Sequence, residues 1–330
     1  MRVVACHSFA APEHLVIEER PSPPCGPGQV RIEVTAVGVN FVDGLIVQGL
    51  YQIKPPLPFV AGSEVAGRLT EVGADVPASL GLSVGQRVVA SVGFGGFATE
   101  IVAPPQQVTP VPGSISDGQA ATFLQSYATA WFALHYRARA QAGQRLLVLG
   151  AGGGVGLAAV DVGRAMGLRV IAAASSADKR ELAVSRGAEA TVDSSVDDVA
   201  TVLKEQVRQW GGGGVDLVYD PVGGELTEHA LRSLVEDGQL LVVGFASGTI
   251  PRLPANHVLL RNRRVTGVEW GGWVATHPAE NRALVAEVFA MVAAGDVQPV
   301  EPRAYRFDDA AVALRDQLER RVAGKSVLIP

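Results

Sequence analysis

The spacing of apolar and polar positions changes twice along this chain of 330 residues. Over residues 1–118, short runs such as QVRIEVTAVGV and QRVVASVG alternate apolar with polar side chains, and turns rich in Pro and Gly separate them. Strands produce this alternation because successive side chains point to opposite faces. We therefore expect a mostly β first domain.

Residues 119–268 repeat a different pattern, in which an apolar strand is followed by an amphipathic helix. RLLVLG precedes a helical stretch from Val155 to Met166, and RVIAAA precedes the helical stretch DKRELAVSR. Further strand candidates are ATVD, VDLVYD, QLLVVG and RVTGVEW. Strands that alternate with helices predict a doubly wound parallel sheet, because parallel neighbours need crossover connections. The predicted fold class is α/β plus β.

The closing segment, residues 269–330, has helical periodicity in AENRALVAEVFAMVAAG and in DDAAVALRDQLERR. It ends on the apolar stretch SVLIP, which predicts a final strand. We expect this segment to fold back onto the first domain, so that both ends of the chain contribute to it.

Glycine residues crowd the turn between the first strand of the doubly wound region and its first helix, within LGAGGGVG. Glycine inside an element costs conformational entropy, so packing alone does not explain the cluster. At such a turn, main-chain N–H groups bind the pyrophosphate of a dinucleotide, and side chains would block its approach. The alternative is a simple tight turn, but the flanking strands and helix favour a dinucleotide. The candidate residues are Gly152, Gly153, Gly154 and Val155.

The end of the second predicted strand indicates which dinucleotide binds. NAD-binding chains usually carry Asp or Glu there to hold the ribose hydroxyls. This chain has Ser175 and Ser176, followed by Lys179 and Arg180. Hydroxyls and cations would bind a 2′-phosphate that a carboxylate would repel, so the pattern favours NADPH. In the alternative interpretation the two cations are only the exposed first turn of a helix.

Charge and composition argue against several other classes of function. The formal net charge is −5, whereas surfaces that bind nucleic acid or anionic membranes usually need a basic excess. The two cysteines and six histidines show no metal-ligand spacing. Because we see no secretory leader and no apolar stretch of membrane-spanning length, we expect a cytoplasmic protein.

Several motifs in order, GVNFVD, LPFVAGSEVAG, VYDPVGG, VVGFASG and GKSVLIP, resemble the medium-chain dehydrogenase/reductase superfamily, specifically its zinc-free quinone oxidoreductase branch. The resemblance implies a GroES-like β domain built from both termini, with a Rossmann domain inserted between them. It also implies NADPH as cofactor and a homodimer formed through an edge strand, for which residues 264–270 are the candidate. The implied substrate is a small hydrophobic quinone or enone.

Two positions bear on a possible metal. In alcohol dehydrogenases of the superfamily, a Cys in a GxCxxD segment and a His in a GHE segment hold the catalytic zinc. The matching positions here are Asn40 and Ser63, and neither is a competent zinc ligand in that setting. We therefore expect no metal. Without a Lewis acid, hydride transfer to a quinone or to the β-carbon of an enone is the favoured direction.

The remaining site residues are assigned by resemblance. Tyr51 is the candidate hydrogen-bond donor to the substrate, and its alternative role is to pack its own loop. Leu45 stands where relatives often have a second tyrosine, which leaves fewer proton donors. Asn40 is a second catalytic candidate or, alternatively, a turn residue in the left-handed conformation. The other positions expected at the cofactor are Asn40, Thr129, Phe245, Ala246, Ser247, Glu269, Trp270 and Lys325.

Some alternatives stay open. Trp270 either approaches the cofactor or belongs to the core or to an interface. Asp193 or Ser194 replaces the family's tyrosine after the third strand of the sheet, which weakens the expected selectivity for NADPH. The function is the NADPH-dependent reduction of a quinone or enone, the reduction of an enoyl or acrylyl thioester, or NADPH binding without turnover.

Overall fold

The chain passes from one structural unit to another at residue 125 and returns at residue 299. The computed structural model describes residues 1–330. The first unit consists of Met1–Gln125 and Pro299–Pro330, and the second unit is Ser126–Gln298. The sequence pattern predicted the return at 269. It comes later because α9 (Trp270–Thr276) and α10 (Pro278–Ala294) belong to the second unit, where Trp131 donates a hydrogen bond to Glu287 at 2.8 Å.

The first unit is built on two sheets. The larger sheet has the order β15-β16-β3-β5-β6-β8, with β7 also paired to β3, and the smaller has the order β2-β1-β4. The strands are β1 Arg2–Cys6, β2 Val16–Glu19, β3 Val30–Val39, β4 Phe59–Val60, β5 Glu64–Val72, β6 Arg87–Ser91, β7 Glu100–Ala103, β8 Val108–Pro110, β15 Arg303–Arg306 and β16 Ser326–Ile329. The helices are α1 Phe41–Val47, α2 Asp117–Ala121 and α11 Ala310–Leu318. Both ends of the chain therefore contribute strands to one core, as predicted.

The predicted alternation is visible in β3. Val30, Ile32 and Val34 are buried in the core of the first unit, while Glu33 between them is exposed. β3 is the longest strand of the unit and pairs with β16, β5 and β7. Its carboxyl end therefore lies beside segments that are far away in the sequence.

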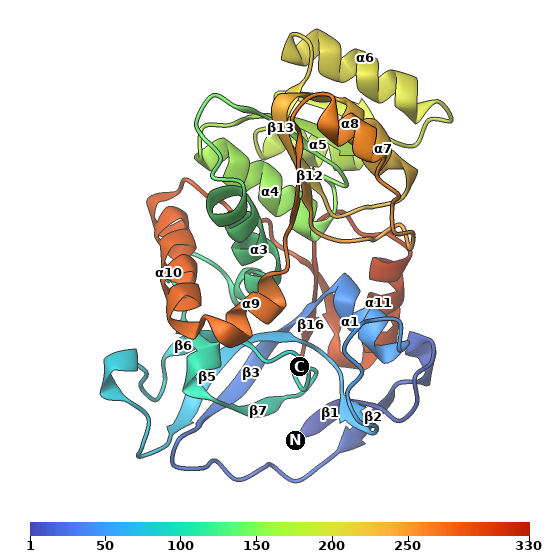
Figure 1. Cartoon of the computed structure of the whole chain (residues 1–330). Coiled ribbons are helices and arrows are strands. Elements are labelled where there is room, and N and C mark those ends of the chain that lie inside the picture. The colour runs from blue at the N-terminus through green and yellow to red at the C-terminus, as the bar shows by residue number, and fades with distance from the viewer. The chain divides into compact units, whose positions relative to one another are not determined.

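The second unit is the predicted doubly wound parallel sheet, with the order β11-β10-β9-β12-β13-β14. Its strands are β9 Arg145–Val148, β10 Arg169–Ala174, β11 Ala190–Asp193, β12 Val215–Asp220, β13 Leu234–Val242 and β14 Arg264–Gly267. Besides α9 and α10, its helices are α3 Thr129–Trp131, α4 Gly154–Ala165, α5 Ala177–Ser185, α6 Val199–Gly211, α7 Glu225–Arg232 and α8 Ala255–Leu259, and they flank the sheet (Figure 1). β14 is an edge strand and ends at Gly267, short of the predicted 264–270.

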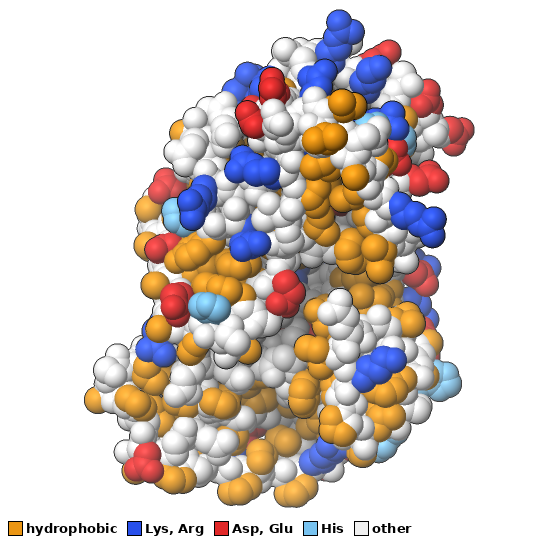
Figure 2. All heavy atoms as spheres, in the orientation of Figure 1, with side chains coloured by type: hydrophobic (Ala, Val, Ile, Leu, Met, Phe, Trp, Pro, Cys, Tyr) orange, Lys and Arg blue, Asp and Glu red, His pale blue; other side chains and the backbone are white.

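The surface carries both signs of charge. On the face drawn in Figure 2, Lys and Arg side chains lie among Asp and Glu side chains rather than in one basic patch. None of the helices combines the length and the apolar character needed to cross a membrane. A cytoplasmic location stays a prediction.

Candidate active site

In the turn after β9, main chain rather than side chains lies at the carboxyl ends of the strands of the second unit's sheet. Gly150 has φ of 59°, in the left-handed region that favours glycine. The Ala151 N–H donates to the Ala173 carbonyl at 3.0 Å, and the Gly153 N–H donates to the Gly150 carbonyl at 3.0 Å. Helix α4 then begins at Gly154 without a side-chain cap. Such a helix N-terminus is the kind of position at which main-chain N–H groups bind phosphate.

Lys179 lies directly over this turn. A Cβ placed on Gly152 would stand 2.4 Å from Lys179 Cβ and 2.6 Å from its Cγ, so only glycine lets the two segments pack this closely. A Cβ on Gly156 would stand 2.3 Å from the Gly150 carbonyl oxygen. Packing therefore requires two of the glycines independently of any ligand. The structure brings the predicted residues Gly152 and Lys179 together.

The second predicted cation has a different environment. β10 ends at Ala174, and the exposed residues Ser175 and Ser176 follow it. The Arg180 guanidinium forms an ion pair with Asp193 Oδ2 at 3.0 Å and donates to the Ala174 carbonyl at 3.2 Å. Asp193 ends β11, the neighbouring strand. The sequence indicated Asp193 only as a replacement for the family's tyrosine, and the ion pair was not predicted.

Hydrogen bonds join the loops after β12 and β13, which also lie at the carboxyl ends of the strands. Asp220, the last residue of β12, accepts from the Val222 N–H at 2.8 Å and from Thr227 Oγ1 at 2.5 Å. The Ala246 N–H donates to the Pro221 carbonyl at 3.0 Å. The predicted segment therefore lies beside the strand ends; it comprises Phe245, Ala246 and Ser247.

Three further predicted residues lie in the second unit. Thr129 begins α3 and is half-buried. Glu269 caps α9, because its carboxylate accepts from the Gly272 N–H at 2.7 Å. Trp270 is 5% exposed and donates from its indole to Asn281 Oδ1 at 3.0 Å. The contacts of Trp270 agree with the core alternative, and a role for these residues at the cofactor stays a prediction.

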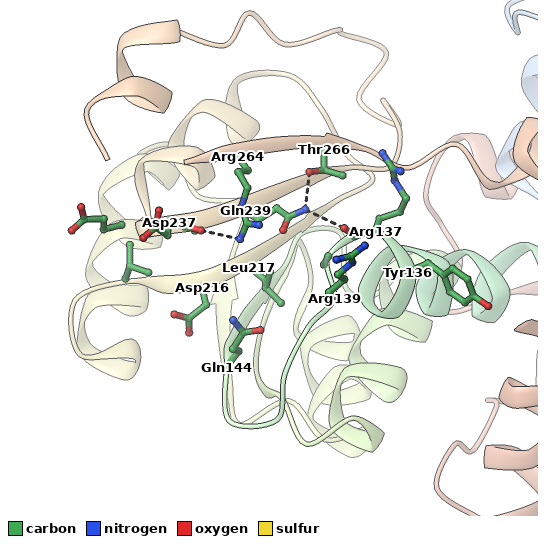
Figure 3. Close-up of a pocket in the computed structure, with 14 residues that line it drawn as sticks. Tyr136, Arg137, Arg139, Gln144, Asp216, Leu217, Asp237, Gln239, Arg264 and Thr266 are labelled. Atoms are coloured by element: carbon green, nitrogen blue, oxygen red, sulfur yellow. Dashed lines mark hydrogen bonds between the residues drawn. The ribbon is translucent and has the colours of Figure 1, made fainter. Parts of the chain in front are cut away.

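A hollow of about 690 Å³ lies at the amino ends of the strands of the same sheet. Its lining residues include Gln144 before β9, Asp216 near the start of β12 and Arg264 at the start of β14. Figure 3 shows Gln239 within it, donating to Thr266 Oγ1 at 2.7 Å. Ligands of doubly wound sheets bind at the carboxyl ends of the strands. This hollow at the amino ends is therefore not part of the candidate cofactor site.

In the first unit, three strand ends bring distant parts of the chain together. β16 and β5 both pair antiparallel with β3, one on each side. Asn40 is the first residue after β3, Ser63 is the last before β5, and Lys325 is the last before β16. In antiparallel neighbours the end of one strand lies beside the start of the next. These three residues therefore meet at one end of the sheet.

Together with two carboxylates, they form a polar group that we call the Lys325 cluster: Asn40, Asp43, Ser63, Glu64 and Lys325. The Lys325 ammonium donates to Asn40 Oδ1. The Asn40 amide donates from Nδ2 to Ser63 Oγ at 3.4 Å, and its main-chain N–H donates to Asp43 Oδ2 at 2.8 Å. Asn40 has φ of −110°, so the alternative that it is a left-handed turn residue is wrong.

The two carboxylates of the Lys325 cluster are buried, with Asp43 1% and Glu64 0% exposed. Burial raises the pKa of Asp43 to about 6, although a hydrogen bond from Ser63 opposes the shift. Burial also raises the pKa of Glu64 to about 7, against the attraction of the Lys325 charge. The pKa of Lys325 is lowered by burial, and both carboxylates oppose that shift. The charge of Lys325 and the charges of the two carboxylates therefore stabilise each other.

Part of this cluster was predicted from the sequence. Asn40 and Lys325 were expected at the cofactor and Ser63 at a former zinc-ligand position, while neither Asp43 nor Glu64 was given a role. A signal was available, because Asp43 and Glu64 are charged residues within otherwise apolar segments, and a buried charge needs a partner. The identity of that partner depends on strand pairing, which no local pattern reveals.

Tyr51 and Leu45 lie near α1 in the first unit. Tyr51 is partly buried and packs against the apolar core, while Leu45 is half-buried on α1 itself. Packing of Tyr51 agrees with its alternative role, and hydrogen bonding to a substrate stays a prediction.

Comparisons with known proteins cover the whole chain. The family described as zinc-binding dehydrogenase matches residues 154–289, and the alcohol dehydrogenase GroES-like domain matches residues 26–113. The chain is 38% identical to quinone oxidoreductase-like protein 2 of Bos taurus over 330 residues, which are 99% of this chain and 92% of that protein.

Solved structures agree with this match. A mycobacterial protein in complex with NADPH is 32% identical, with a TM-score of 0.91 over 100% of both chains. The quinone oxidoreductase of Escherichia coli in complex with NADPH is 28% identical, with a TM-score of 0.88 over 100% of both chains. A GroES-like domain with an inserted Rossmann sheet thus defines the class, and the chain belongs to the medium-chain dehydrogenase/reductase superfamily. Within that class it is a member of the quinone oxidoreductase branch.

Proposed function

We propose that this chain is an NADPH-dependent oxidoreductase that transfers a hydride to a quinone or to an α,β-unsaturated carbonyl compound without zinc. The observation that carries the proposal is the Lys325 cluster. Its ammonium lies among the residues that replace the zinc ligands of alcohol dehydrogenases, Asn40 and Ser63. A zinc ion at this position would be repelled by the Lys325 ammonium and would find neither Cys nor His to bind it. No group of three or more His, Cys, Asp or Glu residues in the chain is arranged to hold a metal ion.

Two features of the second unit support NADPH as the cofactor. Lys179 lies against the glycine-rich turn, and the segment after β10 has hydroxyl side chains instead of a carboxylate that would repel a 2′-phosphate. In this proposal, main-chain groups of the turn hold the pyrophosphate, while Ser175, Ser176 and Lys179 bind the 2′-phosphate. The NADPH complexes of the mycobacterial and Escherichia coli relatives support the same assignment.

NADPH, when bound, supplies a hydride, and the rest of the chemistry is the stabilisation of charge on the acceptor. Hydride transfer leaves negative charge on an oxygen of the acceptor, which a preorganised donor stabilises. Tyr51 and the Asn40 amide are the candidate donors of the first unit. Because Lys325 holds Asn40 Oδ1, the carboxamide keeps Nδ2 as its donor end. Leu45 supplies apolar surface, which suits a hydrophobic acceptor.

We further propose a homodimer that forms through β14. This strand pairs only with β13, so its other edge is unpaired. Val265 on β14 is 41% exposed, and the preceding residues Leu259 and Leu260 are 76% and 75% exposed. An unpaired strand edge beside exposed apolar side chains is a template for a second strand. A second copy of this chain is the partner that the family resemblance implies.

The reaction is tested by following NADPH oxidation with a panel of quinones, enones and an enoyl-CoA. Turnover of quinones or enones would support the proposal. Turnover of the thioester alone would make the chain an enoyl-thioester reductase, and tight NADPH binding without turnover would make it a binding protein. Zinc independence is tested separately by elemental analysis and chelator treatment, where stoichiometric zinc with chelator-sensitive activity would contradict the assignment of Asn40 and Ser63.

A further inference from the structure

We propose that Asp193 is a specificity-determining residue that limits the preference of this chain for NADPH over NADH, because it holds Arg180 and places a negative charge beside the 2′-phosphate site. This inference rests on the proposed binding of NADPH to the second unit. It assigns opposite effects to two neighbouring strand ends. Lys179 favours the phosphorylated cofactor, and Asp193 opposes it.

The position of Asp193 follows from the pairing of β10 with β11. The two strands are parallel, and their register aligns Ala174 with Asp193. The Ser194 N–H donates to the Ala174 carbonyl at 3.1 Å, which extends the contact beyond the strands. Asp193 is therefore fixed next to the strand end that Ser175 follows. This is the strand end at which doubly wound proteins select between the two dinucleotides.

The carboxylate of Asp193 is held in place by two sets of partners. Oδ1 accepts from the Ser195 N–H at 2.9 Å and from Ser195 Oγ at 2.6 Å. Oδ2 pairs with Arg180 at 3.0 Å. Hydrogen bonds from Ser195, with the charge of Arg180, lower the pKa of Asp193, so the carboxylate is ionised at neutral pH. It is a fixed negative charge rather than a side chain that turns away to solvent.

Arg180 is correspondingly engaged. Its guanidinium is shared between Asp193 and the Ala174 carbonyl, and the side chains of Arg180 and Asp193 are 22% and 34% exposed. To bind a 2′-phosphate with full charge, Arg180 would have to weaken its pairing with Asp193. The arriving phosphate would also be repelled by the carboxylate. The ribose hydroxyls of NADH carry no charge, so both effects oppose NADPH specifically.

The effect of Asp193 on the affinity for NADPH should be that of a partly exposed charge pair. Interactions of this kind are modest and are screened by salt. Replacing Asp193 with Asn removes the charge but keeps a side chain of similar shape. We expect the Kd for NADPH to fall about three- to tenfold in Asp193→Asn, while the Kd for NADH changes by less than about twofold. The difference should shrink as ionic strength rises.

The test is titration of the full chain with NADPH and with NADH, by calorimetry or by nicotinamide fluorescence, at low and high salt. Asp197→Asn is the matched control, because Asp197 is an exposed carboxylate on the same connection and its replacement changes the net charge equally. The double variant Arg180→Gln with Asp193→Asn should lose most of the gain. Thermal unfolding of each variant verifies the fold, and Asp193→Ser serves if Asp193→Asn is unstable.

An unchanged or weaker affinity of Asp193→Asn for NADPH would overturn the inference. An equal change for both cofactors, or an equal effect of Asp197→Asn, would also overturn it, because the action would then be unspecific. If the unaltered chain binds neither dinucleotide, the proposed function itself fails. These results are distinguishable, since the first three require a wild-type protein that binds NADPH.

Discussion

The two units of this chain place their functional groups at strand ends in contrasting ways. At the carboxyl ends of the second unit's strands, a contiguous stretch from Gly150 to Gly156 forms the candidate cofactor site. It consists of main chain, and its glycines leave the approach free of side chains. In the first unit, the Lys325 cluster is assembled from two segments near the amino terminus and a third more than 250 residues further along the chain, and charged side chains carry it. The first kind of site is encoded locally, whereas the second exists only after the sheet has formed.

The largest effect should come from removing the cation of the cluster. Lys325→Met leaves Asp43 and Glu64 buried without compensation, and breaking a buried ion group costs about 3 to 5 kcal/mol of unfolding free energy. The loss should be greater at pH 8 than at pH 5.5, because the carboxylates are protonated at the lower pH. Chemical denaturation at both pH values measures it. Lys54→Met, an exposed lysine of the same unit, is the control, and equal losses in the two variants would contradict our view of the cluster.

A second prediction concerns the pH dependence of the unaltered chain. The pKa of Glu64 is about 7 in the folded state and 4.5 ordinarily, so the folded state binds more protons between these values. The stability that Glu64 contributes is fully present below about pH 4.5 and is lost as the pH rises through 7. Glu64→Gln should flatten the fall in unfolding free energy between pH 5 and pH 8 by about 2 to 3 kcal/mol.

The matched control for this measurement is Glu19→Gln, which removes an exposed carboxylate of the same unit. It should leave the pH profile unchanged. A profile of Glu64→Gln that is as steep as that of the unaltered chain would mean that Glu64 is ionised throughout.

The main-chain site of the second unit is tested through its one overlying cation. Lys179→Ala should raise the KM for NADPH much more than the KM for NADH, because a charge-assisted contact is worth about 1.5 to 3 kcal/mol. Steady-state kinetics with both cofactors measure the ratio. Lys204→Ala, on the exposed side of α6, controls for the loss of one positive charge. Equal effects on the two cofactors would remove the role given to Lys179.

The smallest expected effect concerns the edge strand. Val265→Asp places a charge on the unpaired edge of β14, and in a symmetric dimer two such charges would meet. We expect the dimer dissociation constant to rise about tenfold, equivalent to about 1.4 kcal/mol. Analytical ultracentrifugation measures it, with Val184→Asp on α5 as the exposed control. If the unaltered protein sediments as a monomer, the proposed interface through β14 is wrong.

The sequence predicted the fold closely wherever the signal was local. The turn from Gly150 and the helix after it were recognised because a strand, a glycine cluster and a helix follow one another directly. Predictions for individual side chains were less complete. Glu269 caps a helix and Trp270 packs on Asn281, and these contacts depend on how α9 meets its neighbours. The Arg180 ion pair depends likewise on the register between two strands.

The pairing of β16 with β3 has a consequence for synthesis of the protein. Lys325 follows Asp43 and Glu64 by more than 250 residues, so the ribosome makes it long after both carboxylates. Until then, Asp43 and Glu64 have no ammonium to balance them, and the nascent amino-terminal sheet cannot close over them favourably. β16 thus completes the first unit late, and folding of that unit must wait until residues 299–330 have been made.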